Sequence, residues 1–116
     1  MNYTVNDLKV ILAKANQAAV NASEQLYAKY GTDQIGACGF AWVDIYEFEG
    51  KPIKGNTKIG RALKAAGIEQ NWNRKFSQWC NWYGGQNIDI KEAGARAYAR
   101  VLEGYGFTAY AGSRLD

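Results

Sequence analysis

Apolar residues recur at helical spacing through the first quarter of the chain. Between residues 4 and 30 they follow the i, i+3/i+4 pattern, with polar side chains between them. Thr4 or Asn6 can cap the start, and Gly31 is the left-handed residue that commonly ends a helix. The pattern predicts a long amphipathic helix. Its second half is rich in alanine, which favours close approach to a sheet, to another helix or to a second subunit.

A second apolar stripe precedes the carboxy-terminal segment. Asp89 and Glu92 form a capping-box pattern, and the stripe continues to about Tyr105, where Gly106 ends it. The spacing predicts a second long helix. Gly94 lies inside it, at a cost of about 1 kcal/mol relative to alanine, and therefore indicates a close packing contact.

Alternation of side-chain types predicts strands at residues 37–48, 75–83 and 107–112. In the first strand, rings alternate with small or aliphatic residues. One face can therefore pack on a helix, which leaves the aromatic face for a second layer or a pocket. In the second strand both faces are amphipathic, which indicates a binding or oligomer surface. We expect residues 1–116 to form a single α+β domain, an antiparallel sheet packed against two long helices.

Positive charge concentrates between residues 51 and 75. This segment has seven lysines and arginines and one acid, Glu69, a balance of +6 in a chain whose net charge is +3. Thr57 is expected to cap a short helix here, and Lys58 and Arg61 lie on its exposed flank. Two interpretations stay open: an ordinary solvated helix face, or a surface that attracts an anionic partner.

Residue types associated with catalysis are scarce. The chain has no histidine, the commonest general base and metal ligand. Cys38 and Cys80 are too far apart for a zinc motif, and we expect reduced, buried thiols. Phosphate-loop motifs are absent. We therefore expect a binding protein rather than an enzyme, with no metal and no cofactor.

No apolar run is long enough to span a membrane, and the first residues do not form a secretory signal. The sequence therefore favours a cytosolic protein without a membrane partner.

Aromatic and polar residues suggest one candidate ligand site. Trp79, Trp82 and Tyr83 lead into the glycine-rich turn at residues 84–87. Flat rings stack on bases, amides recognise polar edges, and arginines and lysines bind phosphates. The alternative is a core hairpin with an ordinary turn. The predicted ligand-binding set is Lys58, Arg61, Trp79, Trp82, Tyr83, Gln86, Asn87 and Arg114.

Three segments, at residues 38–43, 60–68 and 91–116, together resemble small accessory proteins of tailed phages over about half the chain. The resemblance implies a protein of the infected bacterial cytoplasm. Among such proteins, the Thoeris anti-defence sponges use rings, arginines and an Asn or Gln to hold nucleotide immune signals at subunit contacts. The residue types match, although no ligand-binding residue is carried over position by position.

We therefore expect a non-enzymatic homo-oligomer, a dimer or larger. Its expected ligand is a nucleotide-derived immune signal, of the cyclic ADP-ribose or cyclic oligonucleotide type, which it binds and sequesters. Two other functions stay open: binding of single-stranded nucleic acid, for which charge and rings are interleaved in residues 51–79, and inhibition of a host protein by direct binding.

Overall fold

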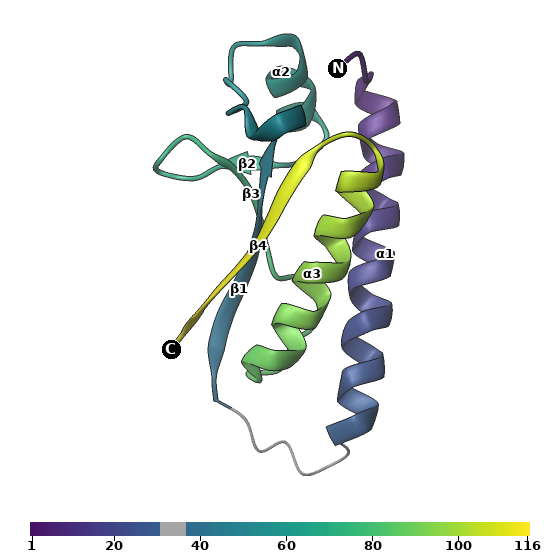
Figure 1. Ribbon diagram of the computed structural model, residues 1–116, viewed down its shortest axis with the longest axis vertical. Helices are drawn as coiled ribbons and strands as arrows, with labels where there is room; N and C mark the ends of the chain where they lie inside the picture. The colour runs from purple at the N-terminus through teal and green to yellow at the C-terminus, as the bar shows by residue number, and fades with distance from the viewer. Residues whose placement is uncertain (31–36) are drawn as a thin grey trace.

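The computed structural model describes residues 1–30 and 37–116 (Figure 1). The predicted helix end at Gly31 lies outside the described residues. The elements are, in chain order, α1 (Val5–Tyr30), β1 (Gly39–Tyr46), the short 3-10 helix η1 (Phe48–Gly50), α2 (Lys58–Ala65), β2 (Glu69–Gln70), β3 (Phe76–Trp79), α3 (Ile88–Gly104) and β4 (Thr108–Leu115).

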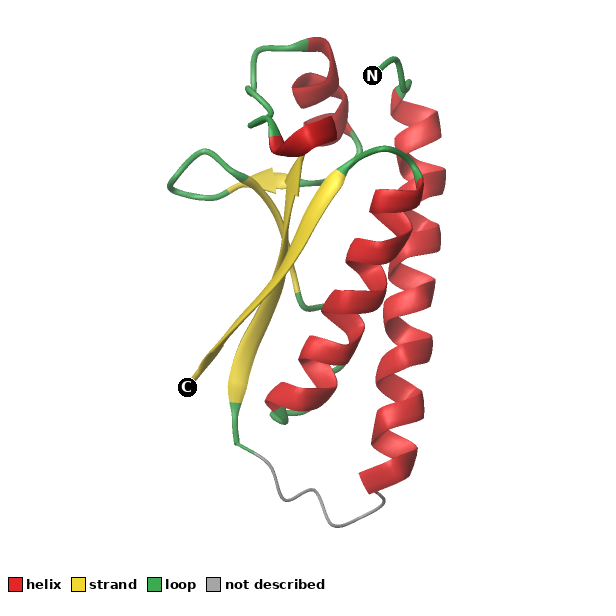
Figure 2. Ribbon diagram, in the orientation of Figure 1, coloured by secondary structure: helices red, strands yellow, loops and turns green. Residues whose placement is uncertain are grey.

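The described strands form one antiparallel sheet in the order β2-β3-β1-β4. After α1, the connectivity is β-α-β-β-α-β, which forms two interleaved βαβ units. Strand β3 lies between β1 and β2 of the first unit, and β1 lies between β3 and β4 of the second. Helices α1 and α3 lie side by side on one side of the sheet (Figure 2). The predicted α+β architecture with two long helices is confirmed.

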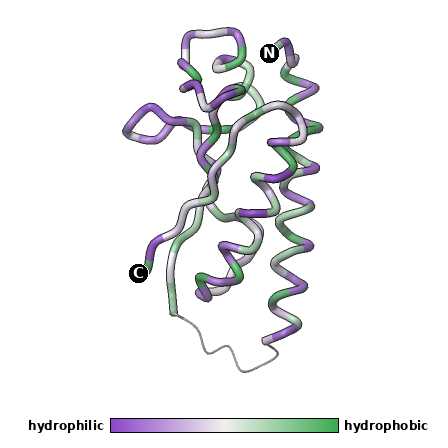
Figure 3. The backbone as a smooth tube through the Cα atoms, viewed as in Figure 1, coloured by the Kyte–Doolittle hydropathy of each residue, from purple (hydrophilic) through white to green (hydrophobic). Residues whose placement is uncertain are grey.

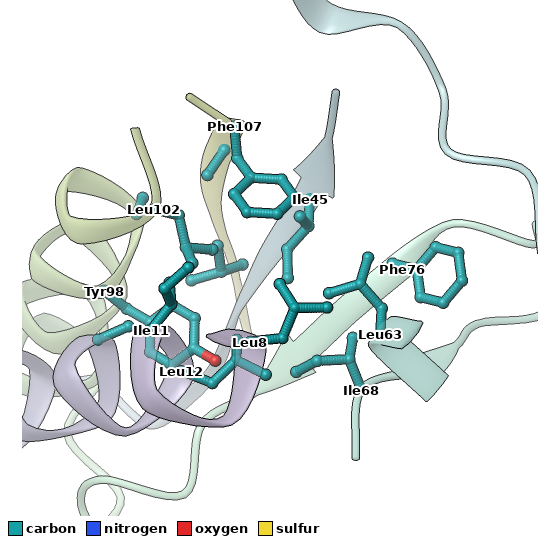
Figure 4. Close-up of a cluster of buried hydrophobic side chains, with 14 of the residues drawn as sticks. Leu8, Ile11, Leu12, Ile45, Leu63, Ile68, Phe76, Tyr98, Leu102 and Phe107 are labelled. Carbon is teal, nitrogen blue, oxygen red and sulfur yellow. The ribbon is translucent and has the colours of Figure 1, made fainter. Parts of the chain in front are cut away.

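The core lies between these helices, α2 and the sheet. In β1, Ala41, Val43 and Ile45 are at most 1% exposed, and they alternate with residues that point away from the helices. The small and aliphatic face of this strand therefore packs on helices, as its pattern predicted. Figure 4 shows Ile45 among side chains from α1, α2, α3, β3 and the connections that precede β2 and β4, with labelled members Leu8, Ile11, Leu12, Leu63, Ile68, Phe76, Tyr98, Leu102 and Phe107.

Small residues bring α1 and α3 close together. Ala15 and Ala19 of α1 are fully buried, and the Ser23 hydroxyl donates a hydrogen bond to the Ala19 carbonyl. A Cβ added at Gly94 of α3 would come within 2.7 Å of the Ser23 Oγ and would overlap the indole of Trp82. The close contact predicted at Gly94 is thus confirmed. It lies within one chain, so these small residues no longer argue for contact between subunits.

The predicted boundaries of α3, β3 and β4 were wrong. Helix α3 is capped by Asn87, whose side-chain oxygen accepts hydrogen bonds from the Asp89 and Ile90 amides, so Asp89 is inside the first turn and not the cap. Strand β3 ends at Trp79 rather than at residue 83, because the chain turns inward to bury Trp82. The last strand is longer than predicted and runs to residue 115.

Both cysteines are free thiols. Cys38 is exposed, so the prediction that it is buried was wrong. Cys80 is half-buried, and this burial raises the pKa of its thiol. Among the helices of the described residues, none combines the length and the apolar character needed to cross a bilayer.

Candidate functional site

One side of the sheet carries exposed rings and is covered by no element of the described chain (Figure 1). In the sheet register, Trp42 of β1 is paired with Trp79 of β3. On the other side of β1, Asp44 is paired with Tyr110 of β4. Paired residues share a face, so side chains of three strands meet on one surface. We call this surface the aromatic face; its rings are Phe40, Trp42, Tyr46, Trp79 and Tyr110.

The rings of the aromatic face form two groups. The ring centroid of Trp79 lies 5.1 Å from that of Trp42 and 6.4 Å from that of Phe40. Tyr46 and Tyr110 form the second group, with centroids 5.6 Å apart. Trp79 is 48% exposed and Tyr110 is 58% exposed, so both groups present ring surface to a ligand. Contiguous exposed rings of this kind mark interaction sites.

Two features hold Trp42 flat against the sheet. Its indole lies over Gly112 of β4, where an added Cβ would approach the ring to 2.6 Å. Its Nε1 donates a hydrogen bond of 3.3 Å to Asp44, and the Ser77 hydroxyl donates to the same carboxylate. The carboxylate in the middle of the face is therefore engaged by two donors, and it orients the indole.

Cations lie beside both ring groups. The Arg114 guanidinium is 5.3 Å and the Lys91 ammonium 5.6 Å from the Phe40 ring centroid. At the other end, the Lys75 ammonium is 5.8 Å from the Tyr46 ring, and a hydrogen bond with the tyrosine raises the pKa of Lys75. The aromatic face thus combines rings for stacking with positive charges at its two ends.

A second feature is a cleft beside the Tyr46 end of the sheet, with a volume of about 790 Å³. It lies between the loop after η1, the side of α2 and the hairpin of β2 and β3. We call it the basic cleft. Its lining residues are Ile45, Tyr46, Pro52, Ile53, Lys54, Gly55, Asn56, Lys64, Gln70, Asn73, Arg74, Lys75 and Phe76.

Two residues of the predicted ligand-binding set meet on the aromatic face. Trp79 contacts Phe40, and Arg114 lies over the same Phe40 ring. The alternation of the strand predicted that Trp79 and Trp82 would lie on opposite faces of it. The structure separates them further, because only Trp79 stays in the strand.

Trp82 and Asn87 of the predicted set are structural. Trp82 is 6% exposed, and its ring is tilted against that of Tyr98 with the centroids 5.7 Å apart. Its Nε1 donates a hydrogen bond to the Lys91 carbonyl. Asn87 is 5% exposed and caps α3. Their burial leaves neither side chain available to a ligand at the surface, and the core interpretation holds for these two.

The other four predicted residues are scattered. Lys58 and Arg61 are exposed on α2, and Arg61 donates a hydrogen bond to the Asn56 carbonyl at 2.7 Å. Tyr83 is half-buried, with its ring centroid 6.2 Å from that of Tyr27 of α1. Gln86 is exposed in the turn before α3. The structure does not bring these residues to the aromatic face.

Most residues of the aromatic face were missing from the predicted set. The signal for three of them was present, because Phe40, Trp42 and Tyr46 alternate along one strand. Tyr110 and Lys91 carried no such signal, since they join the face only through strand pairing and the position of α3. In the described residues, no group of three or more Cys, Asp or Glu side chains could hold a metal ion.

Comparison with known proteins gives no relative: no family model, no curated protein and no solved structure matches this chain.

Proposed function

We propose that this chain binds single-stranded nucleic acid on the aromatic face. The observation that carries the proposal is the row of exposed rings on the open side of the sheet, centred on Trp79 and Trp42. Every base has a flat π-face, and stacking on an aromatic side chain contributes roughly 1–3 kcal/mol per base. Four-stranded antiparallel sheets with rings on their central strands bind single strands in this way. This parallel rests on architecture alone.

The charges of the face suit a strand whose bases lie over the sheet. Arg114 and Lys91 at one end, and Lys75 at the other, place positive charge where phosphates would lie. The Lys91 ammonium also donates a hydrogen bond to the Gly39 carbonyl at 2.7 Å. Asp44 in the middle repels phosphate, which favours bases rather than backbone at that point. Strand β1 has eight residues, a length of about 26 Å, so we expect a site of about four nucleotides.

The test is fluorescence anisotropy with labelled oligonucleotides of one to eight nucleotides and with a duplex of the same sequence. We expect affinity to rise with length up to about four nucleotides and to be weaker for the duplex, whose bases are already stacked. Trp79→Ala should lower the affinity about tenfold or more, because a stacking partner is lost.

The matched control is Tyr27→Ala, which removes a ring of similar exposure from α1, on the opposite layer. It should leave the affinity unchanged. Equal loss in both variants, or no binding by the unmodified chain at micromolar concentration, contradicts the proposal.

A second candidate function is sequestration of a nucleotide-derived immune signal in the cytoplasm of an infected bacterium. The meeting of Trp79 and Arg114 around Phe40 favours it, because one ring and one guanidinium suit a single base and its phosphate. Such a signal must be bound tightly, which favours two subunits sharing the ligand. Cyclic nucleotides and cyclic ADP-ribose isomers should then bind better than linear oligonucleotides and be released intact on heating. Sedimentation should show a dimer or larger.

A further inference from the structure

The basic cleft carries four positive side chains, Lys54, Lys64, Arg74 and Lys75, and none of its lining residues, all within the described chain, is acidic. Among the described residues the ion pair present is Arg96 with Glu92 on α3, away from the cleft. None of the four forms a salt bridge within the described residues, although the Asp44 carboxylate attracts Lys75, and like charges around one cleft repel one another. An anion in the cleft would relieve this repulsion.

The loop wall of the cleft is held closely against α2. The Lys64 ammonium donates a hydrogen bond to the Gly55 carbonyl at 3.4 Å. A Cβ at Gly55 would come within 2.7 Å of that ammonium, and a Cβ at Gly60 would overlap the Lys54 carbonyl. Glycines at these two positions allow the loop to approach the helix and place Lys54 at the cleft.

The hairpin wall carries Arg74 in an unfavourable backbone conformation. Its φ is +63°, in the left-handed region where glycine or asparagine costs less than arginine. The turn is held by hydrogen bonds from the Asn73 and Lys75 amides to the Asn71 side chain and from Gln70 to the Arg74 carbonyl. The arginine lines the cleft, and its backbone conformation lowers the stability of the fold. The turn projects from the sheet in Figure 1 and is hydrophilic in Figure 3.

Beneath the cations the cleft is apolar. Ile45, Ile53 and Phe76 are buried core residues that also line it, and the ring of Tyr46 lies at its border. Side-chain amides of the lining can bond to polar edges of a ligand; they belong to Asn56, Gln70 and Asn73. An apolar surface surrounded by cations and amides suits a molecule with a flat or apolar part and several negative charges. The volume of about 790 Å³ lies within the roughly 300–1,000 Å³ of small-molecule sites.

We propose that the basic cleft is a separate binding site for a small molecule with two or more phosphate groups, of the nucleoside diphosphate class. The phosphates contact Lys54, Lys64 and Arg74, and the base or sugar lies against the apolar surface. The site is independent of the strand proposed for the aromatic face, although Tyr46 and Lys75 border both.

The test is isothermal titration of the full chain with ADP, with pyrophosphate and with adenosine. We expect ADP to bind, pyrophosphate to bind more weakly, and adenosine not to bind in the same range. Lys64→Gln and Arg74→Gly should each lower the ADP affinity about tenfold or more, since each removes a charge-assisted contact. Lys9→Gln, at an exposed lysine on α1, is the matched charge control and should change nothing.

Arg74→Gly also separates a binding role from a structural one. Glycine adopts the left-handed conformation without the steric cost that arginine has there. The variant should therefore unfold at a higher Tm than the unmodified chain while binding ADP less well. A variant that loses both stability and binding would indicate a structural role and overturn the proposal for Arg74.

Three results would overturn the proposal as a whole. These are no heat from ADP or pyrophosphate at millimolar concentration, ADP binding that is unchanged in both cleft variants, and displacement of ADP by a four-nucleotide strand. The last would make the cleft part of the path of a nucleic acid. Trp79→Ala should leave ADP binding intact, so failure of the aromatic-face proposal does not affect this one.

Discussion

At the scale of single residues, Gly112 shapes the aromatic face by having no side chain. The Trp42 indole lies over it, and an added Cβ would approach the ring to 2.6 Å. We predict that Gly112→Val lowers oligonucleotide affinity about tenfold, because the branched side chain lifts the indole from the sheet while β4 tolerates valine. Anisotropy measures the affinity, and circular dichroism checks that the sheet is retained. Unchanged binding would show that the Trp42 ring is not a stacking surface.

At the scale of elements, the contact between α1 and α3 depends on Gly94. A methyl group there would overlap the Trp82 indole and press on Ser23, so Gly94→Ala should reduce the free energy of unfolding by about 1–3 kcal/mol. Gly104→Ala, in the last turn of the same helix, is the matched control, since a Cβ there meets nothing within 4 Å. It should stabilise the protein by up to about 1 kcal/mol. Urea unfolding measures both, and equal effects would contradict the packing argument.

At the scale of the whole molecule, charge is unevenly placed: residues 51–75 carry +6 in a chain of +3. Three cations, Lys75, Lys91 and Arg114, lie beside the aromatic face. If all three contact phosphates, the logarithm of oligonucleotide affinity should fall against the logarithm of salt concentration with a slope of about −2. Arg114→Gln should make this slope shallower by about 0.7, because one phosphate contact is lost. Lys64→Gln in the basic cleft should leave the slope unchanged. A slope near zero would mean that phosphates do not lie beside these cations.

The elements themselves were largely predictable, and the composition of the site was not. The helix spacing of residues 4–30, the Thr57 cap and the alternation around Val43 all appear in the structure, because each depends on neighbours a few positions away. Thr57 accepts the Gly60 amide as a cap should. Trp82 and Asn87 of the predicted ligand set are buried, and their placement depends on how α3 docks.

The sequence by itself therefore determined which face of each element is apolar, aromatic or charged, because side-chain direction follows from helix and strand geometry. It determined that β1 has an aromatic face and that residues 51–75 are basic. Only the tertiary structure decided which faces are covered. Trp79 and Trp82 are three residues apart with similar surroundings in the sequence, yet one is exposed on the sheet and the other is buried beside Gly94. That difference arises because long-range packing of α1 and α3 occupies one side of the sheet, and no local pattern specifies that choice.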